Sequence, residues 1–182
     1  LGEFINDLHL DDIVIIGSSM GGGIAMIHTL RNPSKVKAMI LCGSSGISNI
    51  PLTSGFFKRK NYENIKIQTQ NIFHNKLVPP DEMMEEIYNL ILSYENAIRA
   101  IRLTKSVRKY KMHSDIKQIK TPTLLIWGKN DPITPPEIGV EFHQLLPNSV
   151  LYCLDNCGHV PTQEKPAEVI ELIKSFFKKI SF

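Results

Sequence analysis

The stretch Ile13–Gly23 reads IVIIGSSMGGG. Its four consecutive apolar residues, all but one of them isoleucine, predict a strand that is buried on both faces. The glycines that follow predict a turn too tight for Cβ atoms. Two serines, Ser18 and Ser19, lie between the strand and the glycines. The segment therefore raises the question of whether one of these serines is a nucleophile.

Strand and helix patterns alternate on both sides of this segment. Apolar runs predict strands at residues 13–16, 36–42, 123–127 and 150–154, and apolar spacing predicts helices at residues 22–31, 136–146 and 166–179. The first strand, helix and strand form a unit of the kind that makes a parallel pair with a right-handed crossover. We therefore expect an α/β fold built on a parallel sheet.

Residues 48–114 differ in character from the rest of the chain. They are rich in Lys, Asn, Gln and Glu and contain no strong strand pattern, but they predict helices at residues 82–92, with Asp81 as the cap, and at 94–111. We therefore divide the chain into a core segment, residues 1–47, a helical lid, residues 48–114, and a second core segment, residues 115–182. Six apolar residues of the lid fit either an apolar pocket or simple packing: Phe56, Phe57, Phe73, Met83, Met84 and Ile87.

Residues 17–21, Gly-Ser-Ser-Met-Gly, match the pattern G-x-S-x-G with Ser19 at its centre. A nucleophile on a sharp strand-to-helix turn needs very small neighbours, because the backbones pack closely there. The same turn would aim the Met20 N–H and the N-terminus of the next helix at a developing oxyanion. The alternatives are a plain Gly-rich turn or a phosphate-binding loop, but the segment lacks the P-loop lysine and the dinucleotide register.

Candidates for an acid and a base follow two later strands. Asp131 comes after strand 123–127 in the segment GKNDP, and His159 comes after strand 150–154 in the segment DNCGH. Taken alone, Asp131 is typical of a turn and His159 of a surface loop. Together with Ser19 they follow three different strands in the order Ser, Asp, His, at the edge where open α/β sheets bind ligands. We therefore predict that Ser19, Asp131 and His159 form a catalytic triad.

The sequence resembles the α/β-hydrolase superfamily, in the branch of esterases, lactonases and carbon–carbon hydrolases. The resemblance rests on the segments VIIGSSMGG, TPTLLIWGKNDPITP and CGHVPTQEKP and covers almost the whole chain, including the helical lid. It implies that Ser19 is the nucleophile, Asp131 the acid and His159 the base. A serine nucleophile argues against the relatives that open epoxides or cleave carbon–halogen bonds with an aspartate. Ser18 departs from the family in standing where many relatives have His.

A second departure concerns the N-terminal side. Members of the family usually begin with about four further strands, and one of their loops supplies a second oxyanion N–H, whereas only residues 1–12 precede the first strand here. We therefore expect a three-layer α/β-hydrolase-type sheet that is N-terminally truncated, with the Met20 N–H as the identifiable oxyanion donor. The first strand would have an open apolar edge, which favours a homodimer or a complementing segment.

Composition excludes several other functions. A net charge of +3 over 182 residues, with dispersed charges, gives no sign of a nucleic-acid partner. Three cysteines without a C-x-x-C pair favour a reduced, cytoplasmic protein over a disulfide framework or a zinc site. No apolar run is long enough to span a membrane. We expect a small ester-like substrate and neither a metal nor an organic cofactor.

The predicted function is therefore a serine hydrolase that cleaves a carboxylic ester or a related acyl bond. Two alternatives stay open: an acyltransferase that uses the same triad, and a non-catalytic or fragmentary binding module that has kept these residues. Several polar residues near the predicted site have more ordinary interpretations as structural, packing or loop residues: Asp155, His28, His113, Cys157, Ser44 and Ser45.

Overall fold

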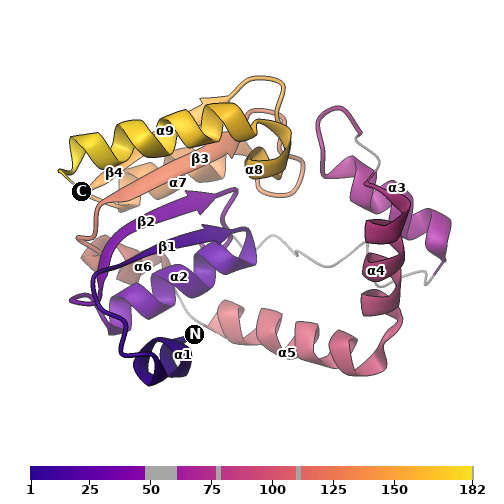
Figure 1. Cartoon of the computed structure of the whole chain (residues 1–182), viewed down its shortest axis with the longest axis horizontal. Helices are drawn as coiled ribbons and strands as arrows, with labels where there is room; N and C mark the ends of the chain where they lie inside the picture. The colour runs from indigo at the N-terminus through magenta and orange to yellow at the C-terminus, as the bar shows by residue number, and fades with distance from the viewer. Residues whose placement is uncertain (48–60, 77–78, 110–111, 182) are drawn as a thin grey trace.

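The computed structural model describes residues 1–47, 61–76, 79–109 and 112–181. Within them lies a four-stranded sheet in the order β1-β2-β3-β4, and every neighbouring pair is parallel (Figure 1). The strands are β1 (Ile13–Ser18), β2 (Val36–Cys42), β3 (Thr123–Gly128) and β4 (Ser149–Leu154). Because all strands run the same way, the loops that follow them meet at one edge of the sheet. The expected parallel α/β fold is confirmed.

Helices cover both faces of the sheet and also form a separate group. The helices near the sheet are α1 (Gly2–Asp7), α2 (Met20–Arg31), α6 (Met112–Asp115), the 3-10 helix η1 (Ile116–Gln118), α7 (Pro136–Leu145), α8 (Pro161–Glu164) and α9 (Pro166–Lys179). The separate group consists of α3 (Tyr62–Asn71), α4 (Asp81–Leu92) and α5 (Tyr94–Lys109). In Figure 1, α3 and α4 lie away from the sheet, and α5 runs from α4 back to contact α2. We call these three helices and the turn after α3 the cap.

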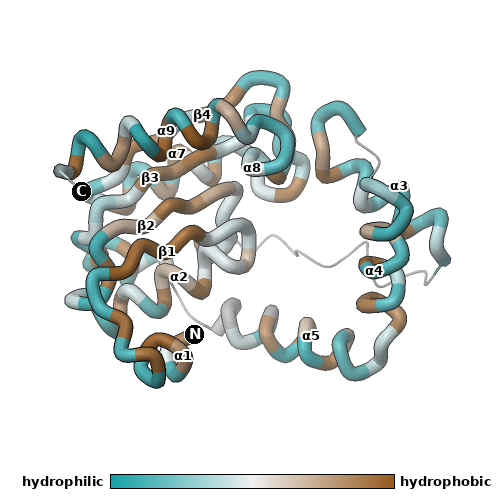
Figure 2. The backbone as a smooth tube through the Cα atoms, in the orientation of Figure 1, coloured by the Kyte–Doolittle hydropathy of each residue, from teal (hydrophilic) through white to brown (hydrophobic). Residues whose placement is uncertain are grey.

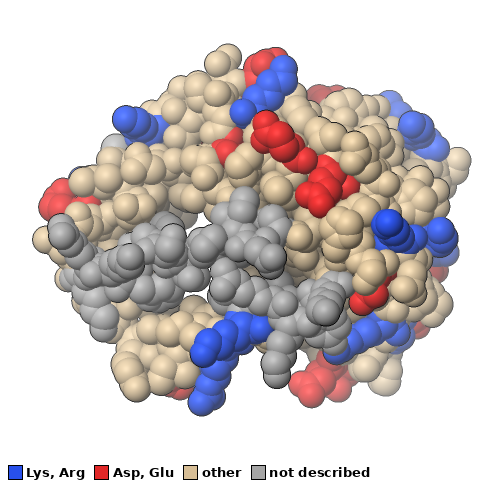
Figure 3. All heavy atoms as spheres, turned by 180° about the vertical axis from the view of Figure 1, so that it is seen from behind, with Lys and Arg blue, Asp and Glu red and all other residues tan. Residues whose placement is uncertain are grey.

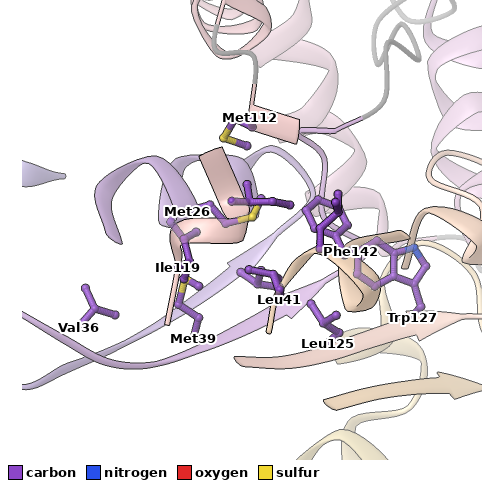
Figure 4. Close-up of a cluster of buried hydrophobic side chains, with 13 residues drawn as sticks. Met26, Val36, Met39, Leu41, Met112, Ile119, Leu125, Trp127 and Phe142 are labelled. Carbon is purple, nitrogen blue, oxygen red and sulfur yellow. The ribbon is translucent and has the colours of Figure 1, made fainter. Parts of the chain in front are cut away.

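The core has one apolar cluster on each face of the sheet. On one face, Met39 and Trp127 of the strands pack with Met26 of α2 and Phe142 of α7, and Met112 and Ile116 close the same cluster (Figure 4). On the other face, alternate strand residues pack against α9 through Val169 and Phe176. Side chains of a strand alternate between faces, so the nearly continuous apolar runs of β2 and β3 supply both clusters. This packing on both faces holds the strands in place, and with them the edge of the sheet from which the loops after the strands extend.

The cap helices are amphipathic and far more polar than the strands (Figure 2). Asn61 begins α3 by accepting a hydrogen bond from Glu63 N at 2.9 Å. Of the apolar lid residues, Phe73 and Met84 are buried and Met83 is 43% exposed, while Phe56 and Phe57 lie outside the described residues. Packing therefore accounts for two of the residues, and the division of the chain into core and lid segments stays a prediction.

Most element boundaries agree with the sequence patterns within two residues. β2 and α9 begin and end at the predicted residues, whereas residues 110–111 of the predicted helix 94–111 lie outside the described part of the chain. The prediction that Asp81 caps its helix is wrong. Asp81 is the first helical residue, Pro80 is the N-cap, and no side chain caps this end. The fixed φ of proline suits the entry to a helix, and Asp81 instead adds negative charge to the first turn.

Strand β1 lies at one side of the described sheet. It pairs only with β2 among the described strands, and Ile16, which stands opposite Ile40, is 59% exposed. Acidic and basic side chains are interspersed on the described part of the face seen in Figure 3. Within the described residues, no helix is both long and apolar enough to cross a membrane. The predicted pairing of β1 with a second copy of the chain stays a prediction.

This prediction is tested by the mass of the protein in solution. If β1 pairs with a second copy, light scattering coupled to size exclusion should give twice the 20.6-kDa mass of the chain. Ile16→Lys should then give a monomer, because a charge on an edge strand blocks pairing. Ile170→Lys is the matched control, since Ile170 is 50% exposed on α9. A monomeric starting protein would contradict the prediction.

Candidate active site

Ser19 occupies a strained turn between β1 and α2. Its backbone has φ 51° and ψ −120°, a positive φ that costs a residue with a Cβ about 1–3 kcal/mol. Hydrogen bonds hold this conformation: Ser19 N donates to Cys42 O at 2.9 Å, and Ser19 O accepts from Ser45 N at 3.0 Å and from Gly22 N at 3.1 Å. The turn is therefore fixed from both sides, by α2 and by the loop after β2.

The close approach of two backbones explains why glycine begins the G-x-S-x-G motif. A Cβ on Gly17 would lie 2.7 Å from Gly22 Cα and 2.8 Å from Gly21 C. These are backbone atoms, so no side chain can rotate out of the way. A Cβ on Gly21 would meet nothing within 4 Å. Of these two glycines of the motif, only Gly17 is thus required by the packing of the turn.

Helix α2 begins immediately after Ser19 with Met20. The first N–H groups of a helix have no acceptor within it, and they carry the positive end of the helix dipole. The Met20 amide is thus one of these first N–H groups, and it directly follows Ser19 in the chain. Its role as the oxyanion donor stays a prediction.

Asp131 and His159 form a buried hydrogen-bonded pair. His159 Nδ1 lies 2.8 Å from Asp131 Oδ2, and the two residues are 7% and 4% exposed. The other carboxylate oxygen, Asp131 Oδ1, accepts from Ile133 N at 2.8 Å and from Thr134 N at 2.9 Å. A carboxylate only accepts, so His159 Nδ1 carries the proton and Nε2 is left as the nitrogen that can take one.

Thr134 is a site residue that the sequence analysis missed. Its Oγ1 lies 2.9 Å from Asp131 Oδ2 and 3.0 Å from Gly43 O, and its carbonyl accepts from the indole N–H of Trp127 at 2.9 Å. The hydroxyl therefore sits between the Asp131 carboxylate and the loop after β2, while Trp127 ties the turn to β3. The signal was present in the segment DPIT, because a hydroxyl three residues after Asp can turn back onto the carboxylate.

The loops that carry Asp131 and His159 are joined to each other through their backbones. Asn130 N donates to Cys157 O at 2.9 Å, and Lys129 N donates to Leu154 O at 2.9 Å. The structure thus brings Asp131 and His159 into direct contact and places Ser19 at the same edge. The Gly43 carbonyl contacts Thr134, and its neighbour Cys42 contacts Ser19, so the end of β2 connects the two halves of the site.

The polar residues given more ordinary interpretations have partners elsewhere or are buried. Asp155 is exposed and pairs with Lys129 at 2.8 Å, and His113 Nε2 lies 3.1 Å from Glu141 Oε1.

The thiol of Cys157 and the imidazole of His28 are both affected by burial. Burial first, and then the charge of Glu164, raise the pKa of the Cys157 thiol to about 12, so it stays a neutral thiol. His28 is buried, and desolvation lowers its pKa. Among the described residues, no cluster of three or more His, Cys, Asp or Glu that could hold a metal ion is found.

The hydroxyls of Ser44 and Ser45 are buried without a hydrogen-bond partner within the described part of the protein. Ser45 N donates to the Ser19 carbonyl, so the loop after β2 that contains both serines supports the turn at Ser19.

The chain is similar to known hydrolases in sequence and in fold. The family model described as Serine aminopeptidase, S33, matches residues 3–166. An uncharacterized hydrolase of Bacillus subtilis, YugF, is 30% identical over 96% of this chain. The 2-hydroxy-6-oxononadienedioate/2-hydroxy-6-oxononatrienedioate hydrolase 2 of Pseudomonas putida is 27% identical over 98% of it. The crystal structure of MGS-MChE2, an α/β hydrolase enzyme from a sediment metagenome of the Mar Chica lagoon, Morocco, aligns over 99% of the chain at 29% identity with a TM-score of 0.74.

The chain spans only part of the length of these proteins: 68% of YugF, 67% of the Pseudomonas hydrolase and 67% of the MGS-MChE2 chain. The matches therefore cover nearly all of this chain, while a third of each relative has no counterpart in it.

The turn geometry predicts opposite effects for two glycine substitutions. Gly17→Ala should destabilise the fold by about 1–3 kcal/mol, because the new Cβ must push the backbone of α2 away from β1. Gly21→Ala should be neutral or stabilising by up to about 1 kcal/mol, because alanine favours a helix and meets no neighbour. Urea unfolding of both variants measures the difference. Equal stability of the two variants would show that the close approach at residue 17 does not constrain the turn.

Proposed function

The chain belongs to the Serine aminopeptidase S33 family of the α/β-hydrolase superfamily, and on that basis we propose that it is a serine hydrolase with Ser19, Asp131 and His159 as its triad. The proposed substrate is a carboxylic ester or a related acyl compound. The observation that carries the proposal is the buried contact of 2.8 Å between His159 Nδ1 and Asp131 Oδ2, at the sheet edge that also bears Ser19.

In the proposed mechanism, His159 Nε2 takes the proton of the Ser19 hydroxyl as its oxygen attacks the carbonyl carbon. Asp131 holds the ring through Nδ1 and stabilises the imidazolium that forms. His159 then gives the proton to the leaving group, which leaves an acyl-enzyme on Ser19. Water, activated by the same nitrogen, attacks the acyl group and restores the free serine.

The strained turn supports the nucleophilic role of Ser19. A positive φ at a residue with a Cβ persists only where the surrounding structure holds it, and such residues cluster at functional sites. In this proposal the Met20 N–H, at the start of α2, donates to the tetrahedral oxyanion. One such donor is typically worth about 10²–10³ in turnover.

The site as proposed needs neither a metal nor an organic cofactor, because the three side chains supply a nucleophile, a base and an orienting carboxylate. The proposed setting is the cytoplasm, since the three cysteines are all free thiols. We assign substrate selection to the cap, which is the part of the chain that stands apart from the sheet (Figure 1).

Covalent labelling tests the proposal directly. A fluorophosphonate probe should attach to the wild-type chain at Ser19, as located by peptide mass spectrometry. Ser19→Ala should abolish labelling, and His159→Ala should slow it by about 10⁴-fold or more. Asp131→Asn should slow it about 10⁴-fold with the fold intact, because an amide favours the wrong tautomer of the imidazole.

Each member of the proposed triad has a control residue of the same type outside the proposed triad. Ser18→Ala changes the neighbouring serine, Asp155→Asn changes the exposed carboxylate after β4, and His113→Ala changes an exposed histidine. Each control should label within about twofold of the wild type. Equal labelling of Ser19→Ala and wild type would refute the proposal.

The same experiment separates the two alternatives. A folded wild-type chain that binds small esters but never reacts with the probe would favour the binding module. A chain that labels at Ser19, but transfers its acyl group to an added alcohol in preference to water, would favour the acyltransferase.

A further inference from the structure

Glu164, the last residue of α8, places its carboxylate between the loop of His159 and the cap. Its Oε1 accepts from Gly158 N at 2.9 Å and from Val160 N at 3.3 Å, the amides on either side of His159. Its Oε2 accepts from His74 N at 2.7 Å, in the turn that follows α3. A single carboxylate thus binds amides that lie far apart in the sequence.

The amide of His159 itself also contacts the cap. His159 N donates to Ile72 O at 2.8 Å. A Cβ on Gly158 would lie 2.5 Å from Ile72 O and 2.7 Å from His74 N, so the two backbones touch at this point. The loop that carries His159 is therefore held by the cap as well as by Asp131.

We propose that Glu164 is a positioning residue, whose carboxylate joins cap residues 72–74 to the loop of His159 and so keeps the imidazole aligned with Asp131. This inference rests on the proposed function, in which His159 is the base. Hydrogen bonds from amides to a carboxylate are about twice as strong as bonds between neutral groups. The two oxygens accept from donors of two different segments, the cap turn and the loop of His159, and only a side chain with two acceptor oxygens can satisfy both in this way.

A purely local role for Glu164 would look different. A carboxylate that only capped the short helix α8 would bind just the amides that precede that helix, those of Gly158 and Val160, and no donor in the cap. The contact of 2.7 Å with His74 N is the shortest of the set and leads out of the loop into the cap. As a consequence, the base is fully aligned only while residues 72–74 are docked, so movement of the end of α3 would be transmitted to His159.

Two substitutions of Glu164 test this connection between the cap and the loop of His159 without a large change in side-chain volume. Glu164→Gln keeps one acceptor oxygen but turns an NH2 group toward the amide donors of either the cap turn or the loop of His159. Glu164→Asp keeps the charge but shortens the side chain, so that it cannot reach both sides. Glu171→Gln is the matched control, because Glu171 is an exposed carboxylate on α9 that forms a 2.8 Å ion pair with Lys174 of the same helix.

The first readout is the rate at which the fluorophosphonate probe modifies Ser19. Both Glu164 variants should slow it roughly 10- to 100-fold, because small misplacements of a catalytic group have effects of that size. For a turned-over ester, kcat should fall while KM changes less than twofold. Glu171→Gln should match the wild type in both measurements.

The second readout does not depend on activity. Hydrogen–deuterium exchange of the peptides that contain residues 72–74 and 157–160 should rise together in both Glu164 variants, by roughly tenfold. Faster exchange in only one of the two peptides, or labelling within twofold of the wild type, would overturn the inference. If the wild-type chain did not label at all, the proposed function would fail, and exchange alone would then decide whether Glu164 joins cap and loop.

Discussion

The hydrogen bond between His159 Nδ1 and Asp131 Oδ2 depends on the alignment of two parallel strands. Gly128, the last residue of β3, stands opposite Leu154, the last residue of β4, so both strands end at the same height. A shift of one residue in this register would turn every side chain of β4 to the other face and move its loop along the sheet. The two apolar clusters, one on each face, prevent such a shift. The relative position of Asp131 and His159 therefore depends on the packing of the core.

Each residue of the proposed site has a local signal in the sequence. Gly17 and Ser19 stand at fixed spacing after an apolar run, and Asp131 and His159 each follow a predicted strand within a few residues. Strand boundaries were predictable for the same reason, since β2 and β3 are nearly continuous apolar runs, with Gly43 directly after β2 and Gly128 at the end of β3. Asp81 shows the limit of local rules, because the preceding proline took the cap position that the carboxylate was expected to fill.

The supporting residues could not be found in this way. Glu164 and His74 are separated by 90 positions, and nothing in the segment PTQE indicates a partner in the turn after α3. The helix α3 itself was missed, because its sequence YENIKIQTQN is polar, with a weak apolar spacing. Thr134 has a local signal toward Asp131, but its contact with the Gly43 carbonyl exists only once β2 and β3 are paired. Contacts between elements that are far apart in the chain can be identified only once the fold is known.

The imidazole of His159 is thus held in two chemically different ways. On the core side it is fixed through its side chain, by a carboxylate whose other oxygen is already saturated with backbone amides. On the cap side it is fixed through its backbone, by Ile72 O and by the Glu164 carboxylate beneath the neighbouring amides. The short helix α8 makes the contact on the cap side possible. Its single turn brings Glu164 back beside Gly158 and Val160, in the loop that precedes the helix. Since the ring is constrained from the core and the backbone from the cap, neither part alone determines where Nε2 points, and the proposed chemistry requires both to be in place.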